Sequence, residues 1–128
     1  MKVVEVVKSY AEAINAKYLA YDDSKAAVIV PIGEFRHQTV LAESKSINGI
    51  YYIALTSKIS NKEAISDENI YEKQKKLLFG KLVIEKDHLE IKAYVDENMA
   101  PSLIKEIFDE IAAFGDIYEK KYTGKDIF

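Results

Sequence analysis

Cysteine and tryptophan are absent from this 128-residue sequence, which also has only five glycines and two prolines. Without cysteine there can be no disulfide framework, no thiolate zinc site and no cysteine nucleophile. The glycines are too scattered to form a phosphate-binding loop or a dinucleotide fingerprint, and no GxSxG elbow occurs. Because no catalytic motif is present, we expect a protein that is not an enzyme and that carries no cofactor.

A basic excess is also missing, since 18 Lys and Arg residues face 21 Asp and Glu residues, for a formal net charge of −3. This balance argues against a nucleic-acid partner, because a phosphate backbone is bound by excess positive charge. No apolar run is long enough to cross a membrane, and charges interrupt the start of the chain, so we expect a cytoplasmic protein. The abundance of Lys, Glu, Ile and Tyr fits a heat-tolerant host or an AT-rich genome equally well.

What the sequence does contain is enough apolar material, 48% of residues, to build the core of one domain over residues 1–128. Apolar residues recur every three or four positions from Val3 to Tyr21, which predicts a helix of about five turns. The helix should end near Asp22, where short polar side chains favour a turn. At the other end of the chain, we expect residues 120–128 to form a frayed tail.

Five strands are predicted from short runs of β-branched and alternating apolar residues. Asn48-Gly49 is a strong hairpin turn, because both residues accept positive φ. A second hairpin turn is expected at Lys86-Asp87. The predicted strands cover residues 26–32, 35–44, 50–59, 81–85 and 89–95.

Two further helices complete the predicted order α-β-β-β-α-β-β-α. Ser60 with Glu63, and Ser66 with Asn69, have the spacing of helix-start caps, so a helix is expected over residues 67–78. Pro101 suits the first turn of the last helix, whose apolar stripe extends to Tyr118 with a bend or end near Gly115. The fold class is therefore α+β, with a five-stranded antiparallel sheet and helices on one face.

This succession resembles the type III secretion chaperone-like fold. The segment from Leu77 to Ile91, LLFGKLVIEKDHLEI, followed by Pro101 to Tyr118, resembles the second half of YbjN-type proteins. The resemblance implies a small non-enzymatic dimer that holds a partner polypeptide on its surface or acts as a regulator. It carries over no catalytic residue, because members of this superfamily provide none.

The two histidines and the acidic pairs are weak candidates for chemistry. His37 lies near Glu34, but alternation places the neighbouring Arg36 on the opposite strand face, and a metal site needs three or four ligands. His88 falls at a hairpin turn, where solvent is its expected surrounding. The pairs Asp22-Asp23 and Asp96-Glu97 lack the spacing of a calcium loop, so we expect no metal.

The informative anomaly is that some strands are apolar on both faces, although a sheet covered on one side should alternate apolar and polar residues. If one set of residues faces the helices, a second apolar set is left on the other side. Such a set would exceed the apolar patches of most monomers and predicts a partner-binding surface. The predicted partner-binding residues are Ile29, Ile50, Tyr52, Val83 and Tyr94.

Three kinds of occupant of that surface remain open from the sequence: the segment 57–66 or the tail of the same chain, a second copy in a homodimer, or a polypeptide client or small apolar ligand. The leading hypothesis is a homodimeric, chaperone-like or regulatory module that binds a polypeptide by burial of apolar surface, through its exposed apolar strands or through the groove along the first helix. The alternative is a small apolar-ligand-binding or enzymatic domain. In that case a pocket between sheet and helices would be furnished with tyrosine hydroxyls and His37.

Overall fold

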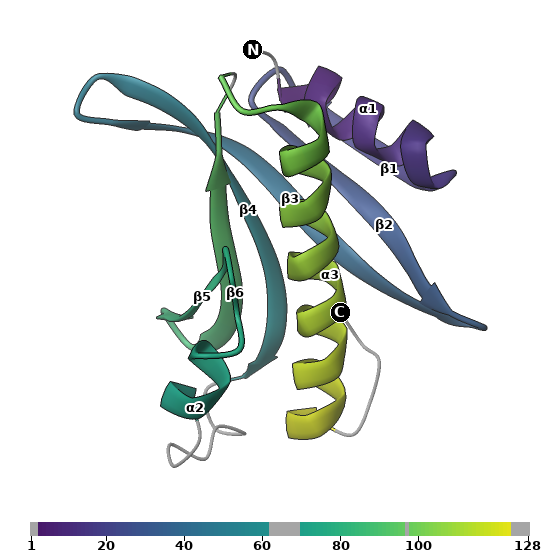
Figure 1. The fold of residues 1–128 in the computed structure, drawn as a ribbon, viewed down its shortest axis with the longest axis vertical. Coiled ribbons are helices and arrows are strands. Elements are labelled where there is room, and N and C mark those ends of the chain that lie inside the picture. The colour runs from purple at the N-terminus through teal and green to yellow at the C-terminus, as the bar shows by residue number, and fades with distance from the viewer. Residues whose placement is uncertain (1–2, 62–69, 97, 124–128) are drawn as a thin grey trace.

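The structure is a computed structural model, and it describes residues 3–61, 70–96 and 98–123. It is an α+β arrangement in which all neighbouring strands are antiparallel (Figure 1). The sheet has six strands in the order β1-β2-β3-β4-β6-β5. The elements are α1 (Val3–Ile14), β1 (Lys17–Asp22), β2 (Lys25–Gly33), β3 (Arg36–Ile47), β4 (Ile50–Asn61), α2 (Ile70–Gln74), β5 (Lys81–Glu85), β6 (His88–Val95) and α3 (Pro101–Thr123).

The first helix is shorter than the sequence predicts, because Asn15 ends it. Asn15 has a φ of 56°, the left-handed conformation that closes many helices. Its N–H donates to the carbonyl of Glu12, and the next N–H, of Ala16, donates to the carbonyl of Ala11 at 2.8 Å. These two bonds form a Schellman motif, which satisfies carbonyls that the helix leaves open at its end.

The prediction of five strands was therefore wrong, and the sheet has a sixth strand in Lys17–Asp22. Tyr18 and Tyr21 continue the helical spacing of α1, which hid a short strand that pairs with β2. The turn between β1 and β2 is held by Asp22, whose carboxylate accepts hydrogen bonds from the N–H and the hydroxyl of Ser24, both at 2.7 Å. These bonds lower the pKa of Asp22.

The other hairpins follow the prediction more closely. Asn48 and Gly49 both have positive φ, at 52° and 79°, and connect Ile47 to Ile50 as a two-residue turn. The β3–β4 hairpin extends further than predicted, with strands of 12 residues each. It is the long projecting ribbon at the upper left of Figure 1.

The helices predicted after β4 differ from the expectation. The described part of α2 has five residues, Ile70–Gln74, whereas the prediction extended to Leu78. The expected caps, which include Glu63, Ser66 and Asn69, lie outside the described residues, as does the end of the tail.

The last helix, α3, runs on to Thr123 and does not end at Gly115. A Cβ atom at Gly115 would lie 3.0 Å from the hydroxyl oxygen of Ser57 and 3.2 Å from Nε2 of Gln38. Glycine is therefore used there to bring α3 close to the sheet.

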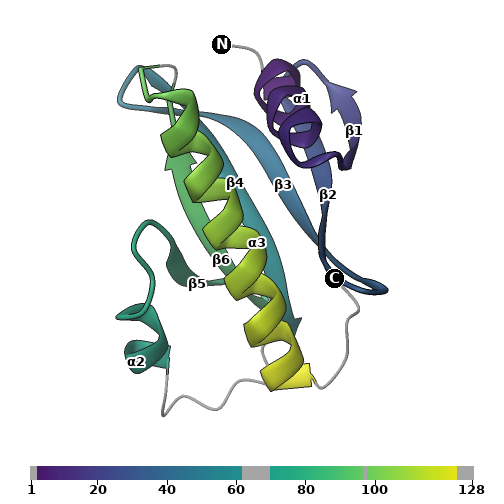
Figure 2. The same cartoon turned by 45° about the vertical axis from the view of Figure 1, so that its right-hand side comes forward.

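The two long helices lie side by side on one face of the sheet (Figure 2). α1 packs mainly on β1 and β2, and α3 packs on β4, β3 and β6. Between helices and sheet lies a core of fully buried side chains, the largest of which include Phe108, Leu55, Ile59 and Leu89. One consequence is that the opposite face of the sheet receives neither α1 nor α3.

A contact between Tyr10 and Phe108 joins the two helices. Their rings stack with centroids 4.2 Å apart, and the Tyr10 hydroxyl donates a 2.7 Å hydrogen bond to a carboxylate oxygen of Asp109. Burial, the hydrogen bond to Asp109 and the charge of Asp109 all raise the pKa of Tyr10, because each disfavours the phenolate.

This contact predicts an alkaline loss of stability that depends on Tyr10. In the unfolded chain tyrosine ionises near pH 10. Since the folded-state pKa of Tyr10 is raised, its contribution to stability is complete below that pH and is lost as the pH rises above it. Urea unfolding at pH 8 and at about pH 11 should show a smaller alkaline loss for Tyr10→Phe than for the wild type. The exposed Tyr21→Phe serves as the control, and equal losses in all three proteins would contradict the prediction.

Candidate functional site

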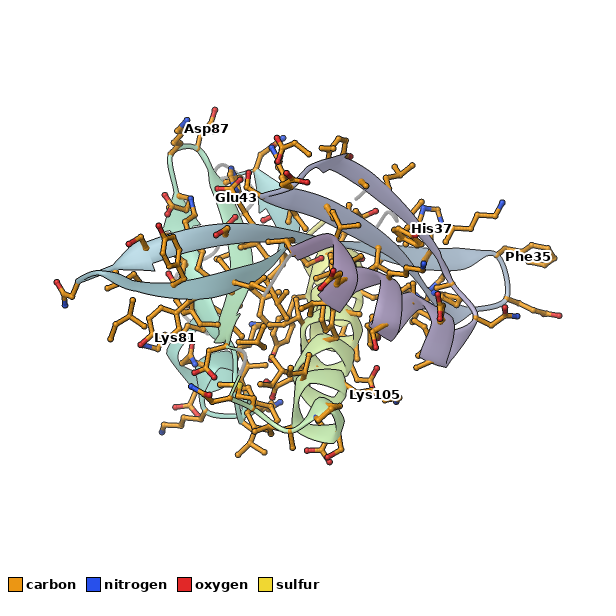
Figure 3. All side chains as sticks on the ribbon, turned by 90° about the horizontal axis from the view of Figure 1, so that it is seen from above. Phe35, His37, Glu43, Lys81, Asp87 and Lys105 are labelled. Atoms are coloured by element: carbon orange, nitrogen blue, oxygen red, sulfur yellow. The ribbon has the colours of Figure 1, made fainter. Side chains whose placement is uncertain are left out.

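The face of the sheet opposite α1 and α3, which we term the open face, is defined by the strand register. Ile53 and Leu55 of β4 are buried toward the helices, so their neighbours Tyr52 and Ala54 point the other way. The pairing of Ala54 with Glu43 on one side and with Tyr94 on the other carries this face across the sheet. Figure 3 shows Glu43 on the far side of the sheet from Lys105 of α3.

The register places all five predicted partner-binding residues on the open face, but it brings only three of them together. Ile50 and Tyr52 are two residues apart on β4, so they share a face. Tyr94, on β6, is paired with Ala54 of β4. Ile29 and Val83 lie farther away, near opposite edges of the sheet. Ile29 is paired with Thr39, and Val83 with Glu90.

The residues that do meet form an aromatic patch, which consists of Ile47, Ile50, Tyr52 and Tyr94 together with the buried Ala54. The rings of Tyr52 and Tyr94 meet edge to face, with centroids 6.3 Å apart. Ile47, Ile50 and Tyr94 keep 43%, 56% and 41% of their surface exposed. Transfer of such apolar side chains out of water is favourable, so the patch is suited to bind another apolar surface.

The patch is exposed because β3 and β4 extend beyond the ends of the strands that flank them, β2 and β6. β2 pairs with β3 only as far as Glu43, and β6 pairs with β4 only from Ile53 onward. The ribbon formed by residues 44–47 and 50–52 is therefore flanked by no other strand of the described chain. Beside this ribbon, a hollow of about 580 Å³ is lined by residues from both of its faces, which include Ile50 and Tyr51, and Tyr51 is 75% exposed.

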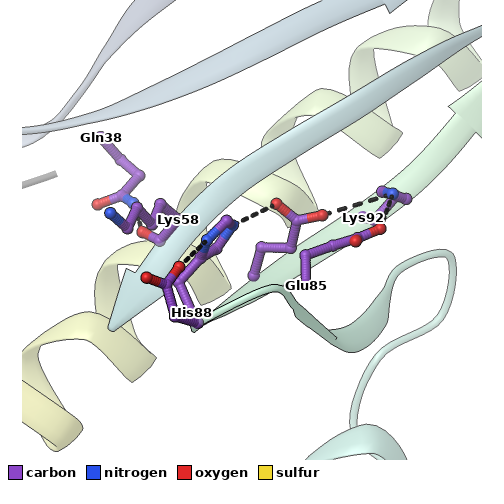
Figure 4. A network of polar contacts seen from close by, with 7 residues as sticks. Gln38, Lys58, Glu85, His88 and Lys92 are labelled. Carbon is purple, nitrogen blue, oxygen red and sulfur yellow. Dashed lines mark hydrogen bonds and ion pairs between the residues drawn. The ribbon is translucent and has the colours of Figure 1, made fainter. Parts of the chain in front are cut away.

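Charged residues border the patch farther along the same face. His88 Nε2 lies 3.1 Å from a carboxylate oxygen of Glu90, and Lys92 Nζ lies 3.4 Å from carboxylate oxygens of both Glu90 and Glu85 (Figure 4). Partial burial alone would lower the pKa of Lys92. The negative charges of Glu90 and Glu85, and the nearby Tyr94, outweigh it, so the pKa is raised. Lys92 therefore stays charged and paired across the physiological range.

Neither histidine belongs to a metal site among the described residues. His37 is exposed on the open face, whereas its neighbour Arg36 reaches the helix side, as alternation predicts. Within residues 3–61, 70–96 and 98–123, no group of three or more His, Asp and Glu side chains is placed to hold a metal ion. His37 points away from the layer between sheet and helices, so it does not furnish a pocket there.

A buried polar set on the helix side escaped the sequence analysis. Arg36 forms an ion pair with Asp116, whose side chain is only 2% exposed. Gln38 donates a 2.7 Å hydrogen bond to the Ser57 hydroxyl, which donates in turn to the carbonyl of Thr39 at 2.8 Å. The ion pair joins the start of β3 to α3, and the hydrogen bonds of Gln38 and Ser57 join β3 to β4. The two residues of each contact lie 18 to 80 positions apart in the chain, so no local spacing predicts them.

A groove between α1 and the start of α3 is the second hollow of similar size, at about 550 Å³. Its walls are mostly apolar and include Val6, Tyr10, Met99 and Ile104, with Lys105 at the rim. The Tyr10 hydroxyl is already bonded to Asp109, so the groove offers shape and apolar surface more than polar recognition.

Comparison with known proteins adds no assignment to this geometry. No family model matches the sequence, and a search of curated proteins likewise returns no match. Among the described residues, no helix combines the length and the apolar character that a membrane crossing requires.

Proposed function

We propose that this protein is a non-catalytic, chaperone-like module of the cytoplasm that acts as a homodimer and holds a polypeptide against the open face of its sheet. The observation that carries the proposal is the aromatic patch. It combines three partly exposed aliphatic and aromatic side chains and the edge-to-face pair of Tyr52 with Tyr94, on a face that α1 and α3 leave uncovered.

The physics of the proposal is burial of apolar surface, with charges at the margin. A bound segment would remove Ile50, Tyr52 and Tyr94 from water, and aromatic residues supply much of the binding energy of protein interfaces. The charged residues beside the patch, such as Lys45 with Glu43 at 2.6 Å, keep the free surface hydrated and select among partners.

The resemblance to secretion chaperone-like and YbjN-type proteins supports the same class of role. The antiparallel sheet, the helices on one face and the hairpin β5–β6 followed by a long helix agree with the expected order. The additional strand β1 departs from that order. The proposal therefore rests on the patch first and on the topology second.

The test compares two neighbouring tyrosines on the same strand that face opposite ways. Tyr52→Glu puts a charge in the aromatic patch, whereas Tyr51→Glu puts the same charge on the other face of the ribbon. Fluorescence anisotropy of a dye-labelled, permanently unfolded polypeptide probe should show at least tenfold weaker binding for Tyr52→Glu, because an unpaired charge would be buried. Tyr51→Glu should bind within about twofold of the wild type.

Circular dichroism of both variants should match that of the wild type, since neither side chain belongs to the buried core. Equal affinity of the probe for the wild type and Tyr52→Glu would reject the open face as the binding surface. An absence of probe binding to the wild type would reject the polypeptide-binding function itself.

The alternative function, a site for a small apolar ligand, is favoured by the groove between α1 and α3. A ligand there would contact Val6, Tyr10 and Ile104 and would leave the open face untouched. Binding that is insensitive to Tyr52→Glu therefore separates this alternative from the main proposal.

A further inference from the structure

The two edge strands of the sheet, β5 and β1, differ in whether another part of the chain covers them. At the β5 edge, the side-chain amide of Gln74 makes the hydrogen bonds that a neighbouring strand would otherwise make. Its Oε1 accepts from the N–H of Leu82 at 2.7 Å, and its Nε2 donates to the carbonyl of Gly80 at 2.9 Å. These bonds occupy backbone groups that an edge strand otherwise offers to another chain. α2 thus blocks pairing at this edge.

The opposite edge, β1, has no comparable cover in the described part of the chain. Five of its six residues are exposed, and β1 is the outermost strand of the sheet on this side. Leu19 and Tyr21 are 51% and 59% exposed. An uncovered edge strand with exposed apolar side chains is a template for pairing with a further strand.

We propose that β1 pairs antiparallel with β1 of a second copy of this chain, so that the two sheets join into one continuous sheet. This inference rests on the homodimer of the proposed function and states how that dimer is built. A twofold axis perpendicular to the sheet relates the two strands, so one surface serves both copies.

The charges of β1 are complementary to themselves in this arrangement. The strand begins with Lys17 and ends with Asp22, and antiparallel pairing puts the Lys17 end of one copy beside the Asp22 end of the other. Both side chains lie toward the open face, as do their partners Ile29 and Lys25. Leu19, near the middle of the strand, would meet the partner strand close to the axis. Opposite charges and apolar pairs across strands both stabilise such pairing.

A dimer built this way has a consequence for the polypeptide site. Because the axis is perpendicular to the sheet, the open faces of both copies lie on the same side. The two aromatic patches then belong to one extended surface. A bound polypeptide can contact both copies at once, which raises its affinity through the high effective concentration of the second site.

Charge reversal tests the pairing. Lys17→Glu places two negative ends side by side, and Asp22→Lys places two positive ends side by side, so each variant alone should dimerise about tenfold more weakly than the wild type. A mixture of the two variants should recover dimers, because every contact in the mixed dimer is again between opposite charges. Sedimentation velocity measures all three samples. Circular dichroism checks that Asp22→Lys folds without its bonds to Ser24.

The geometry is tested separately with a single spin label, since the chain contains no other cysteine. Lys81→Cys places the label on β5, at the far edge from β1. With strands about 4.8 Å apart, two such labels should be about 50 Å apart in the proposed dimer. A face-to-face dimer through the aromatic patches would bring them within about 30 Å.

The outcomes separate this inference from the proposed function. A monomeric wild type, a failure of the mixed variants to recover dimers, or a short label distance would overturn pairing through β1. Binding of the unfolded probe, with its dependence on Tyr52, is measured independently and can hold in each of those cases. A dimer that Lys17→Glu weakens and Tyr52→Glu leaves intact supports the pairing.

Discussion

Replacing Glu110 by alanine is expected to lower the free energy of unfolding by about 3 kcal/mol, because one carboxylate satisfies three backbone donors. Its two oxygens accept hydrogen bonds from the N–H groups of Leu78, Phe79 and Gly80, the latter two at 2.7 and 2.9 Å. Phe79 and Gly80 are partly or fully buried, so water cannot fully replace the lost acceptor. Hydrogen bonds to a charged group are also stronger than neutral ones.

Urea unfolding measures this loss, with Glu106→Ala as the matched control on the exposed side of the same helix. The control should change stability by less than about 0.5 kcal/mol. Because the segment held by Glu110 leads from α2 into β5, the variant should also speed hydrogen exchange at the N–H of Leu82, which Gln74 protects. A stability of Glu110→Ala equal to that of Glu106→Ala would contradict the structure at this point.

A second large effect is expected at the buried ion pair. Arg36→Met should lower the free energy of unfolding by about 3 kcal/mol, because it leaves the carboxylate of Asp116 buried without its cation. The figure is at the lower end of the range for such pairs, since the Arg36 side chain is 40% exposed and solvent screens part of its interaction with Asp116. Methionine keeps the apolar stem, so the loss reports on charge more than on packing.

Asp116→Asn leaves the guanidinium of Arg36 without its counter-ion, but that side chain is 40% exposed and solvent can hydrate it, so the loss should be only about 1 kcal/mol. The double variant should then be more stable than Arg36→Met alone, because the second substitution removes the uncompensated carboxylate. A double-mutant cycle in urea tests this directly. If Arg36→Met cost less than about 0.5 kcal/mol, or if the two losses simply added, the ion pair would not be what holds β3 to α3.

How far the sequence predicts this fold is clearest at Asn15. The apolar spacing from Val3 to Tyr21 is helical throughout, and the signal that ends the helix is one asparagine, which occurs in helices as well as at their ends. The Schellman bonds become visible only in three dimensions. Without these bonds, the sequence pattern assigns the residues of β1 to the first helix, so the uncovered edge strand of the sheet could not be predicted.

Alternation was a better guide to the open face. The strand period of two residues fixes which side chains share a face, so Tyr52 and Tyr94 could be assigned to one side without knowing the strand order. Their proximity could not be predicted, because it depends on the pairing of Ala54 with Tyr94. The same limit applies to Ile29 and Val83, which share the face but lie apart from the patch.

The buried polar contacts could not be predicted from local sequence patterns, because their partners are far apart in the chain. Arg36 and Asp116 are ordinary surface residue types, and each lies in a segment with a regular pattern of its own. Their contact arises only when α3 crosses the start of β3, a close approach that Gly115 permits. Long-range pairs of this kind give the sheet a fixed position under α3, and so they fix the shape of the open face on the other side.

The most direct test of the polypeptide-binding surface uses the tyrosines as reporters in solution. Tyr52 and Tyr94 lie on the open face, whereas Tyr10 is buried between the helices. On saturation with the unfolded polypeptide probe, the ring NMR signals of Tyr52 and Tyr94 should shift or broaden, while those of Tyr10 stay unchanged. Shifts confined to Tyr10 would place the bound segment in the groove between α1 and α3 and would contradict binding at the open face.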